Sequence, residues 1–133
     1  MYLIGFDYGS KRIGVAVGQN FTATARPLAI VRVKNQQIDW THISALIQEW
    51  QPNALIVGLP QHADGSESST TIAAQNFAQQ LKKRYQLPVH HIDERLSSVA
   101  AAERLSEENG KGEAKLDAVA AQIILETWFS ECL

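Results

Sequence analysis

Residues 5–18 read GFDYGSKRIGVAVG, two apolar segments joined by a short polar turn. The apolar segments, at 2–6 and 13–17, have the length of short strands, and the glycine between them favours a tight connection. The stretch therefore predicts a β-hairpin with Asp7 where its first strand ends. A buried carboxylate is costly unless hydrogen bonds, a basic side chain or a metal ion compensate it.

The turn of this hairpin carries two cations, Lys11 and Arg12. Both side chains can bind a phosphate, and Gly9 lets a backbone approach a ligand closely. Turn statistics alone would favour an Asp7 that merely organises a β-turn. The functional interpretation of the hairpin therefore depends on the rest of the chain.

The length and composition limit the classes of protein to which this chain can belong. A chain of 133 residues predicts a single domain over 1–133, and its net charge of −2 restricts any nucleic-acid contact to a local patch. The single cysteine, Cys132, allows neither an internal disulfide nor a CxxC metal site and fits a reducing compartment. We see no signal peptide, and the longest apolar stretch, 118–129, is too short to span a bilayer. A cytoplasmic protein without a membrane partner is expected.

Beyond the hairpin, the apolar pattern predicts alternating strands and helices. Residues 27–33 form a third strand, antiparallel to the second, and Asp39 caps a helix that ends near Trp50. Residues 54–60 are a continuous apolar run, typical of a strand covered on both faces in the middle of a sheet. A last strand is expected over 88–93, with one of its two histidines facing the core and the other a helix.

Three further helices complete the pattern. The first covers 70–85 after a polar loop at 61–69, with Ile72, Phe77 and Leu81 inward; the second follows Ser97 or Ser98, and the third covers 115–129. One apolar stripe is expected on the last helix, formed by Leu116, Val119, Ala120, Ile123 and Thr127. The three tryptophans are interpreted as packing residues: Trp40, Trp50 and Trp128. The order of elements predicts an α/β fold: a ribonuclease H-like mixed sheet, with an antiparallel three-strand meander plus parallel strands, flanked by helices.

Carboxylates gather at one edge of this predicted sheet. Ligands of such sheets bind at the carboxyl ends of the strands, where we expect Asp7 and the pair Asp93-Glu94. Asp117, in the first turn of the last helix, could fold back across this edge. Oxygen ligands without Cys or paired His suit Mg²⁺ or Mn²⁺, and two such ions about 4 Å apart could hydrolyse a phosphodiester. Taken singly, Glu94 is equally a strand-end acid paired with Arg95, and Asp117 an acid that favours the helix dipole.

Six separated motifs resemble the YqgF (RuvX) family of RuvC and ribonuclease H-like nucleases. They occur in the family's order at 6–18, 25–28, 57–60, 64–65, 93–98 and 115–117, so the resemblance spans nearly the whole chain. One departure is the segment before Lys115, at 106–113, which looks shorter than expected for the family. Such a match is far more specific than any one of its motifs.

The resemblance implies metal-binding catalytic acids at Asp7, Glu94 and Asp117, with Arg95 and Lys115 near phosphates. Together with Lys11 and Arg12 these cations are the expected substrate contacts. The family is described as processing the 5′ end of the small-subunit (16S) rRNA precursor, with Holliday-junction resolution as an older proposal. We therefore expect a phosphodiester hydrolase, an Mg²⁺- or Mn²⁺-dependent nuclease acting on structured RNA, with branched DNA as the alternative substrate and a monomer favoured.

Two other classes of function compete with a nuclease. The Asp-x-Gly turn also resembles the phosphate-binding hairpin of the actin, Hsp70 and sugar-kinase group, but those proteins hold ATP between two lobes and 133 residues supply one. Stoichiometric ATP binding would favour that class. The second is a non-catalytic module that binds nucleic acid or a ribosome-assembly partner with the same fold.

Overall fold

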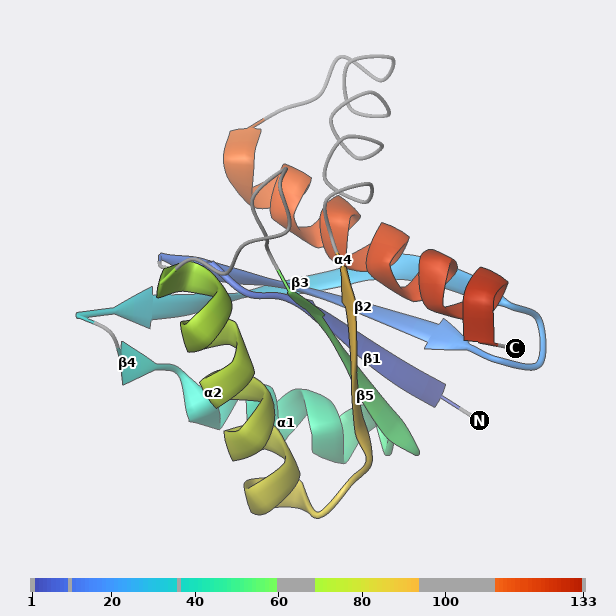
Figure 1. The fold of residues 1–133 in the computed structure, drawn as a ribbon, viewed down its shortest axis with the longest axis horizontal. Coiled ribbons are helices and arrows are strands. Elements are labelled where there is room, and N and C mark those ends of the chain that lie inside the picture. Colours follow the sequence, from blue (N-terminus) through green and yellow to red (C-terminus); the bar gives the residue numbers. More distant parts are fainter. Residues whose placement is uncertain (1, 10, 36, 60–68, 94–111, 133) are drawn as a thin grey trace.

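The computed structural model describes residues 2–9, 11–35, 37–59, 69–93 and 112–132. Within them a mixed sheet is covered by helices on both faces (Figure 1). The strands are β1 Tyr2–Asp7, β2 Arg12–Gln19, β3 Thr24–Lys34, β4 Gln37–Ile38, β5 Ala54–Leu59 and β6 Val89–Asp93, and the helices are α1 Trp40–Trp50, α2 Ser69–Tyr85 and α4 Gly112–Cys132.

The strand order is β4-β3-β2-β1-β5-β6. β1, β2, β3 and β4 form an antiparallel meander, whereas β5 lies parallel to β1 and β6 parallel to β5. This confirms the predicted fold class and the interior position of β5. The sequence pattern missed β4, because a strand of two residues is too short to show an alternation.

The start of α1 follows from its cap. The side chain of Asp39 accepts a hydrogen bond from the backbone N–H of His42 at 3.2 Å, which satisfies one of the donors that a helix leaves open at its N-terminus. At the other end Gln51 adopts a left-handed conformation, φ 49°, and donates its N–H to the carbonyl of Ile47. The predicted helix at this position is confirmed.

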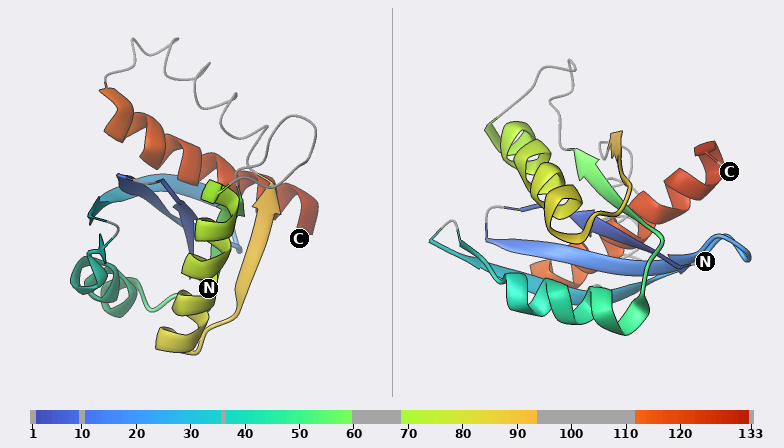
Figure 2. Two further views of the ribbon diagram at one scale, coloured as in Figure 1. Left: turned by 60° about the vertical axis from the view of Figure 1, so that its left-hand side comes forward. Right: turned by 90° about the horizontal axis from the view of Figure 1, so that it is seen from below.

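Helices α1 and α2 cover one face of the sheet and α4 covers the other (Figure 2). The two faces carry different cores. Under α1 and α2 the packed side chains include Phe6, Val15, Leu55 and Phe77. Under α4 they include Leu3, Ala16 and Ile56 from the sheet and Ala121, Leu125 and Phe129 from the helix. Alternate residues of each strand therefore face opposite layers.

The expected inward face of α2 is confirmed for Phe77 and Leu81, which are buried, and was wrong for Ile72, which is 52% exposed. The other buried residues of α2 are Thr71, Ala74 and Ala78, at helical spacing from Phe77 and Leu81. On α4 the residues packed against the sheet are Ala121, Ile124, Leu125 and Phe129. Of the expected stripe, Val119, Ala120 and Ile123 are buried but lie outside this cluster, Thr127 is half-buried, and the side chain of Leu116 is outside the described residues. Residues 118–121 and 123–125 are all buried, so this stretch of the helix has no polar face from which a stripe could be predicted.

Of the expected positions of His90 and His91, the one against a helix is confirmed, because His90 contacts Trp128 of α4. The one facing the core was wrong, because both histidines are exposed. β6 is the last strand of the sheet order, and the imidazole of His90 stacks on Trp128 with ring centroids 4.5 Å apart. Trp40, Trp50 and Trp128 all pack against core residues, as predicted. The helix expected after Ser97 or Ser98, the loop at 61–68 and the segment 106–111 lie outside the described residues.

Partial burial and then the neighbouring His90 lower the pKa of His91 below its usual 6.5. The unfolded chain therefore binds a proton at His91 more readily than the folded chain does, so this residue disfavours folding as the pH falls through about 6.5. Urea unfolding at pH 7.5 and 5.5 should show a smaller stability difference for His91→Gln than for the unsubstituted protein. An equal difference in both proteins would contradict this assignment.

No helix among the described residues is both long enough and apolar enough to cross a membrane.

Candidate active site

Three parallel strands end side by side at one edge of the sheet. Asp7, the last residue of β1, pairs with Gly58 of β5, and the next residue of β5, Leu59, pairs with Asp93 at the end of β6. The carboxyl ends of β1, β5 and β6 therefore lie next to one another along this edge. Glu94 and Arg95 follow Asp93 directly in the sequence and lie outside the described residues.

Asp7 belongs to the α4 side of the sheet. Phe6 and Ile4 lie in the core under α1 and α2, whereas Leu3 lies in the core under α4. Since successive strand residues point to opposite faces, the side chain of Asp7 is on the same side as that of Leu3. It is half-buried and makes interactions within the molecule.

Helix α4 is held to this strand by a close approach at Gly5. A Cβ placed on Gly5 would lie 2.7 Å from Cγ of Leu125 and 3.2 Å from the carbonyl oxygen of Ala121. Farther along the helix, the ring of Phe129 lies against Gly18, the residue that pairs with Leu3. The helix therefore runs opposite to β1, as Figure 1 also shows.

The direction of α4 indicates where the backbone of Asp117 lies. Asp117 precedes Ala121 by one helical turn. Going from Phe129 to Ala121 along α4 corresponds to going from Leu3 to Gly5 along β1. One more turn therefore leads toward the end of β1 that carries Asp7. The backbone of Lys115 also belongs to this N-terminal part of α4.

The expectation that Asp117 lies in the first turn of its helix was wrong. The helix begins at Gly112, which puts Asp117 in the second turn. The stabilisation of an acid by the helix dipole falls off within the first turn. The dipole therefore stabilises an acid at residue 117 less in a helix that begins at 112 than it would in a helix that began at 115.

The hairpin crown between β1 and β2 is fixed by its own backbone. A Cβ on Gly9 would lie 2.5 Å from the carbonyl oxygen of Arg12, so the turn itself requires glycine and no ligand is needed to explain it. The carbonyl of Lys11 accepts a hydrogen bond from the N–H of Val33 at 3.0 Å, which ties the crown to β3. Lys11 is exposed and Arg12 is half-buried.

Two further cations, not among the expected site residues, lie beside Lys11 and Arg12. Arg32 and Lys34, on β3, line the same hollow of about 500 Å³. The sequence does contain a pattern that could have identified these two cations: valine alternates with a cation over residues 31–34. Such alternation is typical of a strand with one buried and one exposed face.

Among the described residues no group of three or more His, Cys, Asp and Glu side chains could hold a metal ion. The side chains of Asp93 and Asp117 are outside this description, as is the whole of Glu94. Of the predicted acids, therefore, only Asp7 has a described side chain; Asp117 is described only as part of the backbone of α4, and Glu94 lies outside the described residues.

Comparison with known proteins gives a consistent result. The family model described as "RuvX: Holliday junction resolvase" matches residues 1–131. Proteins from Hydrogenovibrio crunogenus and Legionella pneumophila (strain Paris), both named "Putative pre-16S rRNA nuclease", are 51% and 50% identical to this chain; the matches cover 95% and 96% of it and 91% and 94% of those proteins.

Solved structures support the same fold. RuvC of Thermus thermophilus, in complex with a Holliday junction substrate, gives a TM-score of 0.58 at 13% identity, over 99% of this chain and 96% of that one. The Fowlpox virus resolvase, in complex with Holliday junction DNA, gives 0.59 at 16% identity, over 100% of this chain and 99% of that one. At such identities the likeness establishes the ribonuclease H-like fold and nothing finer.

Proposed function

The chain belongs to the RuvX family, and from that membership we propose that it is a metal-dependent endonuclease that processes the 5′ end of the 16S rRNA precursor. The observation that carries the proposal is the position of Asp7 at the common carboxyl edge of β1, β5 and β6, on the face covered by α4. Relatives about 50% identical over nearly their whole length bear the name of such a nuclease. We place the activity in the cytoplasm, where a chain with one cysteine meets a reducing environment.

The proposed catalytic acids are Asp7, Glu94 and Asp117. Their support is convergence along the backbone: Glu94 comes directly after the last residue of β6, and α4 leads Asp117 back toward the end of β1. All three offer oxygen donors only, which fits Mg²⁺ or Mn²⁺ and not zinc. Either ion, when bound, would activate a water and stabilise the leaving oxygen of a phosphodiester.

The chain's own residues have three tasks in this proposal. The carboxylate of Asp7 is held by a strand buried on both faces, so the position of the metal ligand is fixed before the substrate arrives. Lys11 and Arg12, at the mouth of the hairpin, bind phosphate oxygens of the substrate, with Arg95 and Lys115 as further phosphate contacts. The backbone of Lys11 is tied to β3 by the hydrogen bond from Val33, and Arg12 begins β2, the strand that pairs with β1 and Asp7.

Precursor rRNA is proposed over a four-way DNA junction because the names of the close relatives specify it. A resolvase also needs two active sites in a symmetric dimer to cut paired strands. The proposal keeps this chain a monomer. Junction resolution is the second candidate because the family model and the solved complexes carry that description.

The test compares two substrates under two conditions. We expect the protein to cleave a 16S rRNA precursor fragment with its 5′ leader in Mg²⁺ or Mn²⁺, and to lose that cleavage in excess chelator. A four-way DNA junction at equal concentration should be cut more slowly. Cleavage that persists in chelator would contradict the metal mechanism, and paired nicking of junctions without RNA cleavage would favour the second candidate.

A further inference from the structure

A basic groove lies near the candidate active site. It is the hollow of about 500 Å³ lined by Lys11, Arg12, Arg32 and Lys34 together with Ile30 and Val33. Four of these six described lining residues are cations and none carries a carboxylate. In a chain with a net charge of −2, such a concentration of positive charge is a local feature that needs its own explanation.

The basic groove belongs to the same face of the sheet as Asp7. Ile13, Val31 and Val33 lie in the core under α1 and α2, so Arg12, Arg32 and Lys34 alternate to the α4 side. Asp7 pairs with Gly14, which is two residues along β2 from Arg12. Arg12 therefore lies one strand away from Asp7, about 5 Å across the sheet, and two residues farther along the strand direction, about 7 Å.

The strand register brings like charges together in the groove. Arg12 is the direct partner of Arg32 across β2 and β3, and Lys34 is the next residue of β3 on that face. Like charges directly opposite each other destabilise a sheet. Arg12 also makes an interaction within the molecule, whereas Arg32 and Lys34 are exposed, so an anion bound across these two side chains would offset the repulsion.

Protection of an exposed sheet edge, a common reason for lysine on a strand, does not account for these cations. Arg32 pairs with β2, and its carbonyl accepts a hydrogen bond from the N–H of Asp39 at 3.2 Å. Lys34 pairs with Gln37 of β4. The backbone of Arg32 therefore has neighbours on both sides and that of Lys34 is paired with β4, while the side chains of both residues are exposed.

We propose that the basic groove binds the sugar-phosphate backbone of the nucleic-acid strand that is cleaved at Asp7, with Arg32 and Lys34 contacting phosphates. This rests on the proposed nuclease function and adds two binding residues and the direction in which the strand leaves the site. Contacts to phosphates do not read sequence, so the groove serves affinity and positioning.

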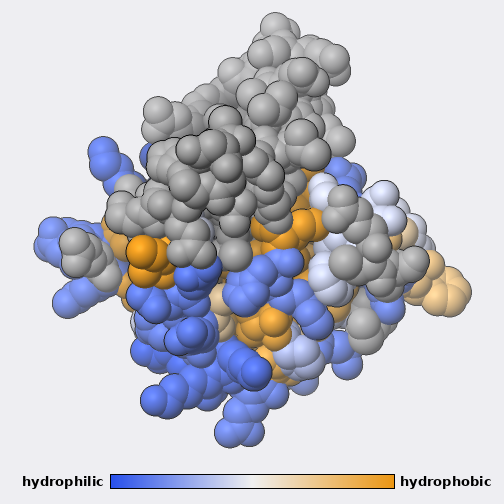
Figure 3. Space-filling view, in the orientation of Figure 1, coloured by the Kyte–Doolittle hydropathy of each residue, from blue (hydrophilic) through white to orange (hydrophobic). Residues whose placement is uncertain are grey.

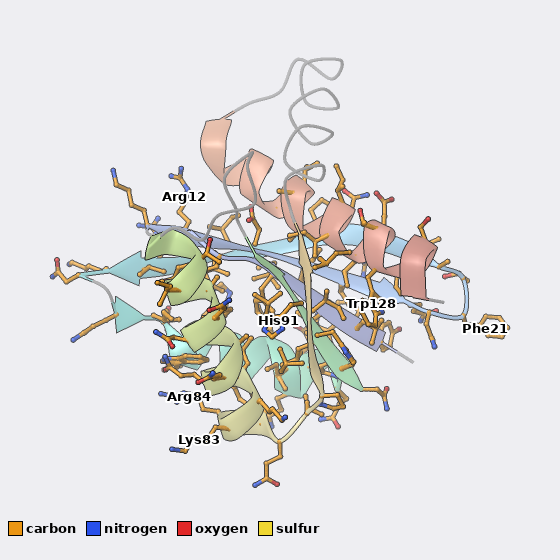
Figure 4. All side chains as sticks on the ribbon, in the orientation of Figure 1. Arg12, Phe21, Lys83, Arg84, His91 and Trp128 are labelled. Atoms are coloured by element: carbon orange, nitrogen blue, oxygen red, sulfur yellow. The ribbon has the colours of Figure 1, made fainter. Side chains whose placement is uncertain are left out.

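The test uses a double variant and a matched control. Arg32→Ala with Lys34→Ala removes two charges from the groove; Lys82→Ala with Lys83→Ala removes two from the end of α2, on the other face of the sheet. Figure 4 shows Lys83 far from Arg12, and Figure 3 shows the outer surface of α2 as largely hydrophilic. Both substitutions change the net charge equally.

Binding is measured in excess chelator, so that no strand is cut, with a 16S rRNA precursor fragment and with an RNA of the same length and shuffled sequence. The groove variant should bind both RNAs roughly tenfold more weakly near 0.1 M salt, and the slope of log K against log salt should become shallower by about 2. The α2 variant should stay within about twofold of the unsubstituted protein.

Unchanged affinity in the groove variant, an equal loss in the α2 variant, or a loss confined to one of the two RNAs would each overturn the proposal. Failure of the nuclease function has a different signature. In that case the unsubstituted protein would not cleave RNA in Mg²⁺ or Mn²⁺, while the groove-dependent binding in chelator would still be present.

Discussion

Asp7→Asn is expected to reduce cleavage of precursor rRNA by roughly 10³-fold, the order of loss seen when a group that stabilises the transition state is removed. Asn keeps the volume of Asp but cannot supply a negative charge to a cation. Because Asp7 is half-buried at the end of a strand whose neighbours are buried, the substitution should leave the fold intact. Single-turnover cleavage in Mg²⁺, with circular dichroism for the fold, measures both effects.

The matched control is Asp39→Asn, the same chemical change at the cap of α1. Asn caps a helix about as well as Asp, and α1 packs on the face of the sheet away from α4. This variant should cleave at the rate of the unsubstituted protein. Full activity of Asp7→Asn, or an equal loss in both variants, would remove Asp7 from the catalytic site.

Gly5→Ala is expected to have the second large effect, because α4 leaves no room for a side chain at this position. The added Cβ would meet Cγ of Leu125 at 2.7 Å and the carbonyl of Ala121 at 3.2 Å. Overpacking of this kind lowers the free energy of unfolding by about 1–3 kcal/mol. It should also move α4 away from β1 and with it Asp117, and a displacement of about 1 Å can reduce a rate on the order of a hundredfold.

A double-mutant cycle separates this contact from a general weakness of the variant. In a Leu125→Ala background the atom nearest to the added Cβ is gone, so Gly5→Ala should destabilise the protein less there than it does alone. Urea unfolding of the four proteins gives the coupling free energy. Additive effects would show that Leu125 does not exclude a side chain at residue 5.

The fold could be predicted from the sequence to the extent that local chemistry determines it. Asp39 and Pro52 bracket α1 because a capping acid and a helix-breaking residue act within a few residues. The continuous apolar run at 54–60 predicted an inner strand because a short strand buried on both faces has no polar positions, and the structure has β5 at 54–59 in the interior of the sheet. Where burial removes the contrast between faces, as along 118–125 of α4, the sequence could not identify the side that meets the sheet.

The candidate site likewise combines features that the sequence predicts with features that only the tertiary structure decides. By itself the sequence determined an acid at the end of a hairpin strand, its two neighbouring cations and the family resemblance, because each is a local pattern or an ordered set of them. Only the tertiary structure brought Arg32 and Lys34 next to Arg12, since 20 positions of sequence separate the paired arginines and strand pairing alone joins them. The same holds for the face on which Asp7 lies and for the direction of α4, because the close approach of this helix at Gly5 is a tertiary contact that no local pattern around residue 5 specifies.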